Sequence, residues 1–192
     1  ISQSALPTPA KTILSAGKPA SKAACTSPPL TQSAPRPFAD KIVFAGVGKA
    51  DWEINLGLDN DIFCFNVESA VELEIINELA AAKHKVASIA LRINPEVDAH
   101  THAKITTGMK ENKFGINLSQ LGGVLDKLKE MKNVKLIGIH SHIGSQITDM
   151  SSFRNLVIRF NEIQEELEAH GVTVENLNFG GGLGIDYYHP NH

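Results

Sequence analysis

The chain has 192 residues, of which 42% are apolar and 20% charged, a composition typical of a globular protein with one sizeable core. Its formal net charge of −3 offers no basic surface for nucleic acid, and no apolar run is long enough to cross a membrane. Two cysteines, Cys25 and Cys64, exclude a disulfide framework and a cysteine-rich zinc site, and they are compatible with a reduced, cytoplasmic setting.

Residues 1–40 differ in composition from the rest of the chain. They hold seven of the nine prolines and six serines, and this proline density leaves neither a helical nor a strand pattern. We predict a low-order segment, because it cannot bury enough apolar surface to offset the entropy lost on folding. A transit peptide is an alternative, although the prolines prevent an amphipathic helix. Because the chain starts at Ile1 and stops at His192, just after a motif-rich stretch, we expect both true ends to lie beyond it.

From residue 41 onward, apolar runs alternate with helical patterns. The apolar runs predict strands over 42–45, 61–67, 86–93, 134–141 and 177–179. Helical spacing predicts helices over 69–82, 118–131 and 150–170, the first of them starting with a capping box formed by Ser69 and Glu72. Continuous apolar strands separated by helices favour a parallel sheet. A doubly wound sheet or part of a (β/α)8 barrel satisfies this order, since a whole barrel needs about 250 residues.

In both parallel architectures ligands bind at the carboxyl ends of the strands, and the chemically unusual residues of this chain follow the predicted strands. The first two strands run into residues 46–49 and 66–69. The other three end in a set of polar residues and glycines: Arg92, Asn94, His140, Ser141, His142, Gly144, Ser145, Gly180, Gly181, Gly182 and Gly184. The sequence therefore predicts one site at the rim where the strands end.

The glycine run over residues 180–182 is the most informative of these loops. Successive glycines allow backbone N–H groups to turn toward an anion without a Cβ clash, and a phosphate is the natural ligand. A tight turn with positive φ angles is the alternative, but three consecutive glycines exceed what one turn requires. The spacing differs from the GxGxxG fingerprint of dinucleotide sites, and no acidic residue follows about 20 positions later.

His140 and His142 have three interpretations. At strand spacing i and i+2 both imidazoles face the same side, where they could bind a metal ion as in His-x-His metallohydrolases. Alternatively, one imidazole could lie flat against an aromatic cofactor ring, or both could be ordinary core histidines. Gly144 and Ser145 follow, and a bend with a hydroxyl donor suits a phosphorylated ligand better than a bare metal ion, so we predict no metal.

Arg92 ends a predicted buried strand and needs an anionic or aromatic partner there. That partner is either a ligand or a carboxylate in a structural ion pair, for which Glu68 and Glu96 are the candidates. Cys64 lies in an apolar run and is predicted to be a buried, unreactive thiol.

Six segments, in this order along the chain, resemble the diaminopimelate branch of the pyridoxal-phosphate-dependent ornithine, diaminopimelate and arginine decarboxylase family, whose barrel is like that of alanine racemase. They are KIVFAGVGK (41–49), CFNVES (64–69), LRINPEVDAHTH (91–102), TGMKENKFGI (107–116), HSHIGSQI (140–147) and NFGGGLGIDY (178–187). The resemblance covers residues 41–192, and six motifs together are far more specific than any one of them.

The resemblance implies a fold, a cofactor and a reaction. Residues 41–192 would form part of a (β/α)8 barrel of the TIM type that binds pyridoxal 5′-phosphate, in a protein that forms a homodimer when complete. His142 would stack on the pyridine ring, and Arg92 would lie near the cofactor. The phosphate would be held by Ser145 and by the amides of Gly180, Gly181 and Gly182. The implied reaction removes a carboxylate from meso-2,6-diaminopimelate to give L-lysine and CO2, the last step of lysine biosynthesis.

The resemblance breaks down within residues 1–40. The family's Schiff-base lysine belongs near Gln3, but the chain reads Ser2-Gln3-Ser4-Ala5 there, so no catalytic residue is identified. A shifted reading frame, restored near residues 38–41, would explain a segment whose length fits and whose sequence does not. A divergent N-terminal extension is the alternative.

Several functions therefore stay open at this point. The main hypothesis is decarboxylation of diaminopimelate by the complete protein, with ornithine, arginine and carboxynorspermidine as sibling substrates. The second is a barrel fragment that binds the cofactor without turnover. A metallohydrolase built on His140 and His142 would need further ligands at other strand ends, and none is evident. The cofactor hypothesis requires that Gly181 and Ser145 lie close together at the open end of the barrel.

Overall fold

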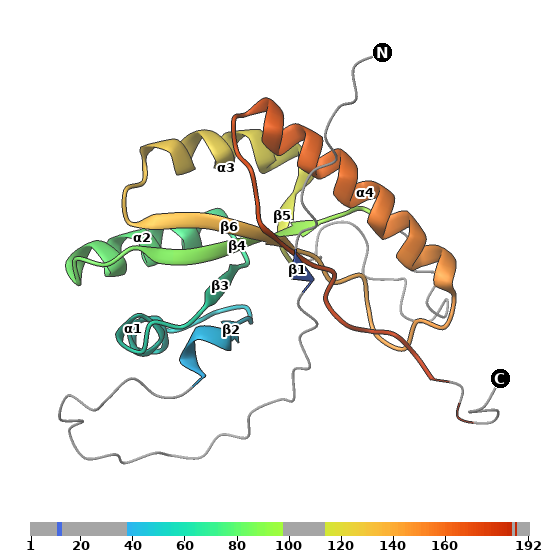
Figure 1. Cartoon of the computed structure of the whole chain (residues 1–192), viewed down its shortest axis with the longest axis horizontal. Helices are drawn as coiled ribbons and strands as arrows, with labels where there is room; N and C mark the ends of the chain where they lie inside the picture. The colour runs from blue at the N-terminus through green and yellow to red at the C-terminus, as the bar shows by residue number, and fades with distance from the viewer. Residues whose placement is uncertain (1–10, 13–37, 98–113, 186, 188–192) are drawn as a thin grey trace.

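The fold is a curved, fully parallel sheet with helices along one face, shown in Figure 1 as a computed structural model of the chain. The structure describes residues 11–12, 38–97, 114–185 and 187. Most of the segment predicted to have little order, and the polar loop before Phe114, lie outside these residues. No helix in the described part combines the length and apolar character needed to cross a bilayer.

Strands and helices alternate through most of the described chain. The strands are β1 (Lys11–Thr12), β2 (Val43–Phe44), β3 (Cys64–Val67), β4 (Ala87–Asn94), β5 (Ile116–Asn117), β6 (Val134–His140) and β7 (Asn176–Asn178). The helices are α1 (Asp51–Asp59), α2 (Ala70–Ala82), α3 (Leu118–Glu130) and α4 (Met150–Ala169), with a short 3-10 helix, η1 (Ala39–Lys41). The strand order is β1-β7-β6-β4-β3-β2, and β5 pairs with β4. Every pair is parallel, and β2, β3, β4, β6 and β7 are neighbours in chain order, without the reversal of a doubly wound sheet. This order confirms the prediction of a partial (β/α)8 barrel.

The predicted elements from residue 41 onward are confirmed, with shifts of a few residues at their ends. Helix α1 and the two-residue strands β1 and β5 were not predicted. Strand β1 lies in the segment for which the prolines predicted no strand, so that prediction is wrong for Lys11–Thr12, which pair with β7. Helix α1 was missed because its apolar residues are not confined to one face: Ile54 and Leu58 are buried, whereas Trp52 and Leu56 are exposed.

The two faces of the sheet carry different residues because side chains alternate along each strand. In β4, Ile89, Leu91 and Ile93 belong to the large core that includes the buried residues of helices α2, α3 and α4. Ala90 faces the other way and packs with Cys64 and Ile137. Arg92 is two residues beyond Ala90, so it lies on this second face, toward the inside of the curve and close to the carboxyl end of its strand.

Strands β6 and β7 approach each other closely at Gly138. A Cβ atom added there would lie 2.7 Å from the Asn176 carbonyl oxygen, which is backbone and cannot swing away. Just before this point Ile89 pairs with Leu136 and Ala90 pairs with Gly138, so Ile137 forms a bulge in the ladder. Gly138 therefore sets the spacing of the two strands that lead to the glycine run.

We expect Gly138→Ala to lower the free energy of unfolding by about 1–3 kcal/mol, because the added methyl forces strands β6 and β7 apart. The matched control is Gly123→Ala, since Gly123 is exposed in helix α3 and has nothing within 4 Å of its virtual Cβ. This second change should stabilise the protein by about 0.5–1 kcal/mol through helix propensity. Urea unfolding of both variants measures the difference, and equal effects would contradict the assigned role of Gly138.

Candidate functional site

The site lies where the loops after β6 and β7 run side by side. Ile147 and Leu183 form a parallel bridge. The Ile147 N–H donates to the Gly182 carbonyl oxygen at 2.8 Å, and the Gly184 N–H donates to the Ile147 carbonyl oxygen at 2.8 Å. The Gln146 side-chain amide adds a bond to the Ile185 carbonyl oxygen at 2.8 Å. The parallel pairing of the two strands thus continues into their loops.

Glycines are required at this junction both by their φ angles and by close contacts. Gly180 and Gly182 have φ angles of 73° and 97°, in the region that side chains disfavour. A Cβ on Gly182 would lie 1.8 Å from the Gly144 carbonyl oxygen and 3.4 Å from the Ser145 Cα atom. The glycine run and the imidazole-serine loop are therefore in backbone contact, made by Gly182 with Gly144 and Ser145.

The amides of the glycine run are not equally free. The Gly180 N–H donates to the Asn178 side-chain oxygen at 2.9 Å, so it is already satisfied. The Gly181 N–H makes only a long bond of 3.4 Å, to Nδ1 of His142. The Gly180 N–H therefore stabilises the loop itself, whereas the Gly181 N–H remains available to a ligand.

His142 is an exposed imidazole beside this loop. Because its Nδ1 accepts a hydrogen bond, the neutral ring carries its proton on Nε2. Partial desolvation and the positive charge of Arg92 lower the pKa of His142, while Glu68 opposes the shift. The lowered pKa favours the neutral ring, and the residue is exposed to solvent.

His140 is the buried partner in the pair, only 5% exposed. Its Nδ1 atom has no hydrogen-bond partner among the described residues. Burial, and then the charges of Arg92, His142 and Lys49, lower the pKa of His140 from 6.5 to about 3. His140 is therefore a neutral core histidine with one nitrogen left unsatisfied. In the described part of the chain, no three His, Cys, Asp or Glu side chains are placed to hold a metal ion together.

Arg92 is fixed by a carboxylate and an aromatic ring. Its Nη1 lies 2.5 Å from Oε2 of Glu68, and the Glu68 side chain is only 3% exposed. The Arg92 guanidinium also lies over the Phe114 ring, with 5.8 Å between Cζ and the ring centroid. Of the two carboxylates considered from the sequence, Glu68 is the partner, whereas Glu96 is exposed.

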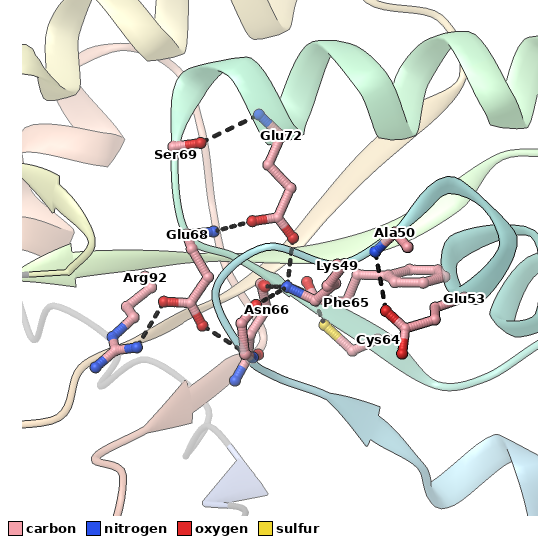
Figure 2. Close-up of polar contacts among 11 residues, drawn as sticks. Lys49, Ala50, Glu53, Cys64, Phe65, Asn66, Glu68, Ser69, Glu72 and Arg92 are labelled. Atoms are coloured by element: carbon pink, nitrogen blue, oxygen red, sulfur yellow. Dashed lines mark hydrogen bonds and ion pairs between the residues drawn. The ribbon is translucent and has the colours of Figure 1, made fainter. Parts of the chain in front are cut away.

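The sequence analysis did not identify Lys49 as a site residue, nor the ion pair that its ammonium forms with the Glu72 carboxylate. The Lys49 ammonium is buried and bonded to the carbonyl oxygens of Gly46 and Asn66, at 2.8 and 2.7 Å, and to the Glu72 carboxylate (Figure 2). Ser69 caps helix α2 by accepting the Glu72 N–H, as predicted. The other half of the predicted capping box is wrong, because the Glu72 carboxylate binds Lys49 and the Glu68 N–H instead.

Cys64 is a buried thiol, as predicted. Burial raises its pKa to about 12, and the nearby Lys49 charge opposes this only in part. Cys64 is therefore protonated and unreactive. Cys25 lies outside the described residues.

The chain thus forms a partial parallel barrel with a glycine junction, a serine and a neutral imidazole at its rim, an arrangement compatible with a phosphorylated ring cofactor. The model of one family, "pyridoxal-dependent decarboxylase, pyridoxal binding domain", matches residues 30–192, and the chain belongs to this family. The cofactor of the family is pyridoxal 5′-phosphate.

Known relatives agree with this assignment. The chain is 67% identical over 153 residues to diaminopimelate decarboxylase of Bacteroides thetaiotaomicron, a match over 80% of this chain and 40% of the relative. It is 45% identical over 149 residues to that of Haemophilus influenzae, covering 78% of this chain and 36% of the relative. A crystal structure of diaminopimelate decarboxylase from M. jannaschii superposes with a TM-score of 0.72 at 41% identity, over 81% of this chain and 36% of that one. The chain thus spans 40% or less of the length of each of these relatives.

We expect Gly182→Ala to destabilise the loop junction, because its Cβ would overlap the Gly144 carbonyl oxygen and its φ angle would be strained. The expected loss in the free energy of unfolding is about 2–5 kcal/mol. Faster hydrogen exchange at the Ile147 and Gly184 amides would place the damage at the junction. Gly171→Ala is the control: its φ is also positive, at 76°, but nothing lies within 4 Å of its virtual Cβ, so it should lose only about 1–2 kcal/mol. Unchanged exchange at Ile147 would contradict the role of Gly182.

We expect His140 to make the protein sensitive to acid. Because the folded pKa is lowered, stability is fully present above pH 6.5 and is lost as the pH falls toward 3, by about 1.4 kcal/mol per pH unit. His140→Phe keeps a buried ring and removes this proton, so its unfolding free energy should fall less steeply between pH 6.5 and 4. Urea unfolding across this range measures the slope, and an equally steep slope in His140→Phe would contradict the assignment to His140.

Proposed function

We propose that the chain is part of the cofactor domain of an enzyme that converts meso-2,6-diaminopimelate to L-lysine and CO2. The observation that carries the proposal is the junction of the two loops, which brings His142, Ser145 and Gly181 to one rim of a parallel barrel. The relatives support the choice of substrate within the family. One similar structure, at 42% identity with a TM-score of 0.71 over 79% of this chain and 35% of that one, is diaminopimelate decarboxylase from M. jannaschii in complex with L-lysine.

The residues at the rim fit a phosphorylated aromatic ring. His142 would stack on the ring of pyridoxal 5′-phosphate, and the Ser145 hydroxyl with the Gly181 and Gly182 amides would hold its phosphate. The long bond from the Gly181 N–H to the imidazole supports this, because a phosphate oxygen is a stronger acceptor that this N–H can take instead. When bound, the cofactor supplies an electron sink for the charge left by departing CO2.

The charged side chains of Arg92 and Glu68 lie beside this rim and affect its electrostatics. Arg92 lies near the cofactor in this proposal, and its ion pair with Glu68 keeps the guanidinium oriented. Partial burial, and then the positive charge of Arg92, lower the pKa of His142, so the neutral imidazole can stack on the ring without bringing a second cation. We place the start of the cofactor domain near residue 41, where η1 ends, and propose that the complete protein is a cytoplasmic homodimer.

The second hypothesis, cofactor binding without turnover, is favoured by one observation. Lys49 is a lysine near the rim, but its side chain is only 1% exposed and its ammonium contacts three acceptors, so it cannot serve as the reacting amine. The same purified protein separates the two hypotheses, because one predicts CO2 release and the other predicts binding alone.

The test measures pyridoxal 5′-phosphate affinity and CO2 release in the complete protein that carries this chain. We expect release from meso-diaminopimelate and far less from ornithine or arginine. Ser145→Ala should weaken cofactor binding about tenfold or more, because it removes a hydrogen bond to a charged phosphate. Ser119→Ala, at an exposed position in helix α3, should have no effect. Unchanged cofactor affinity in Ser145→Ala would refute the proposed site. Cofactor binding without CO2 release from diaminopimelate, ornithine or arginine would favour the second hypothesis.

A further inference from the structure

Four charged side chains connect three strand ends on the side of the site away from the glycine junction. Lys49 follows β2, Glu68 follows β3, Glu72 lies in the first turn of α2, and Arg92 is near the end of β4. The set holds two cations and two anions, and in Figure 2 these side chains converge around the loop that follows β3. We propose that Lys49 is a positioning residue for Arg92, acting through Glu72 and Glu68. The proposal deepens the proposed function and rests on it.

Lys49 acts as a cross-link between segments. Its three acceptors come from three segments: Gly46 from its own loop, Asn66 from the end of strand β3, and Glu72 from helix α2. These contacts use all three protons of the ammonium group. A surface lysine would gain little from such pairing, but this side chain is only 1% exposed. A buried ion pair is costly to form, so its main effect here is to select one arrangement of the three segments.

The link from Lys49 to Arg92 runs through both oxygens of each carboxylate. Glu72 binds Lys49 with one oxygen and accepts the Glu68 N–H with the other, at 3.0 Å, which fixes the backbone at residue 68. Glu68 accepts the Gly46 N–H with Oε1 at 3.1 Å and binds Arg92 with Oε2 at 2.5 Å. Gly46 is thus held at its N–H by Glu68 and at its carbonyl oxygen by Lys49. The contacts thus form a closed ring of four residues, which are Lys49, Glu72, Glu68 and Gly46. Glu68 connects this ring to the site, because its Oε2 atom binds Arg92.

Removing the Lys49 ammonium breaks two contacts of this ring, those to Glu72 and to the Gly46 carbonyl oxygen. Glu72 and the Gly46 carbonyl oxygen lose their cation, so the backbone at residue 68 is no longer held from the helix side. The Glu68 carboxylate then has more freedom, and Arg92 loses its fixed partner while it keeps its contact with the Phe114 ring. The expected result is a mobile Arg92 guanidinium in an otherwise folded protein.

The first test needs no cofactor. In the purified protein, exchange of the Arg92 guanidinium protons with water is followed by NMR, and Lys49→Met should speed it at least about tenfold. The control, Lys83→Met, removes an ion pair to Asp59 at 2.6 Å beyond the end of helix α2 and should leave the exchange unchanged. Lys49→Met leaves a buried Glu72 without its cation and could fail to fold. The second variant, Lys49→Met with Glu72→Gln, removes that unpaired charge and should show the same fast exchange. Slow exchange of Arg92 in either variant overturns the proposal.

The second test is a double-mutant cycle on cofactor affinity. Lys49→Met should weaken pyridoxal 5′-phosphate binding about tenfold when Arg92 is present and should have little further effect once Arg92→Gln has been introduced. A merely structural lysine would weaken binding equally in both backgrounds, and that result overturns the proposal. If the protein with both residues intact binds no cofactor, the proposed function fails, while the exchange measurement still decides whether Lys49 positions Arg92.

Discussion

The backbone contact between the loops after β6 and β7 is the constraint on which the rest of the site depends. It extends the parallel ladder beyond the strands through bonds between the Ile147 backbone and Gly182 and Gly184. Because the contact is made by main-chain atoms and admits no Cβ at Gly182, the two loops behave as one unit. Ser145 and His142 are therefore positioned by hydrogen bonds of the sheet rather than by the packing of their own side chains.

The electrostatics of the rim follow from what is buried beneath it. The inner face of the sheet carries Arg92 with Glu68 as its counterion. His140 stays neutral there because burial, and then the Arg92 charge, lower its pKa. His142 is more exposed, and partial burial together with the same cation lowers its pKa as well. The rim thus presents hydroxyl, amide and imidazole groups to an anion. The permanent positive charge beside these groups is that of Arg92, which is paired with Glu68.

How much of this could be predicted depends on whether local sequence or tertiary contact decides the structure. Strand β4 is a continuous apolar run and helices α2, α3 and α4 carry helical periodicity, so their positions were predicted to within a few residues. The rim residues were predicted because strand ends of a parallel sheet meet at one edge, which is a property of the topology and not of any single residue. Helix α1 was missed because its apolar residues lie on both its buried and its exposed sides.

The role of Lys49 could not be predicted, since its acceptors come from segments that only the fold brings together. The same holds for the Glu72 carboxylate, for which the local capping box was the simplest expectation. A lysine directly after a glycine-rich strand end was the one available signal, and it does not distinguish a buried cross-link from a solvated loop.

Leu183 shows what a junction made of backbone atoms permits. It pairs with Ile147 through the main chain while its side chain is 65% exposed. A substitution of the Leu183 side chain would therefore change the shape and polarity of the surface without removing the main-chain pairing beneath it. The surface at this position is thus independent of the backbone that supports it.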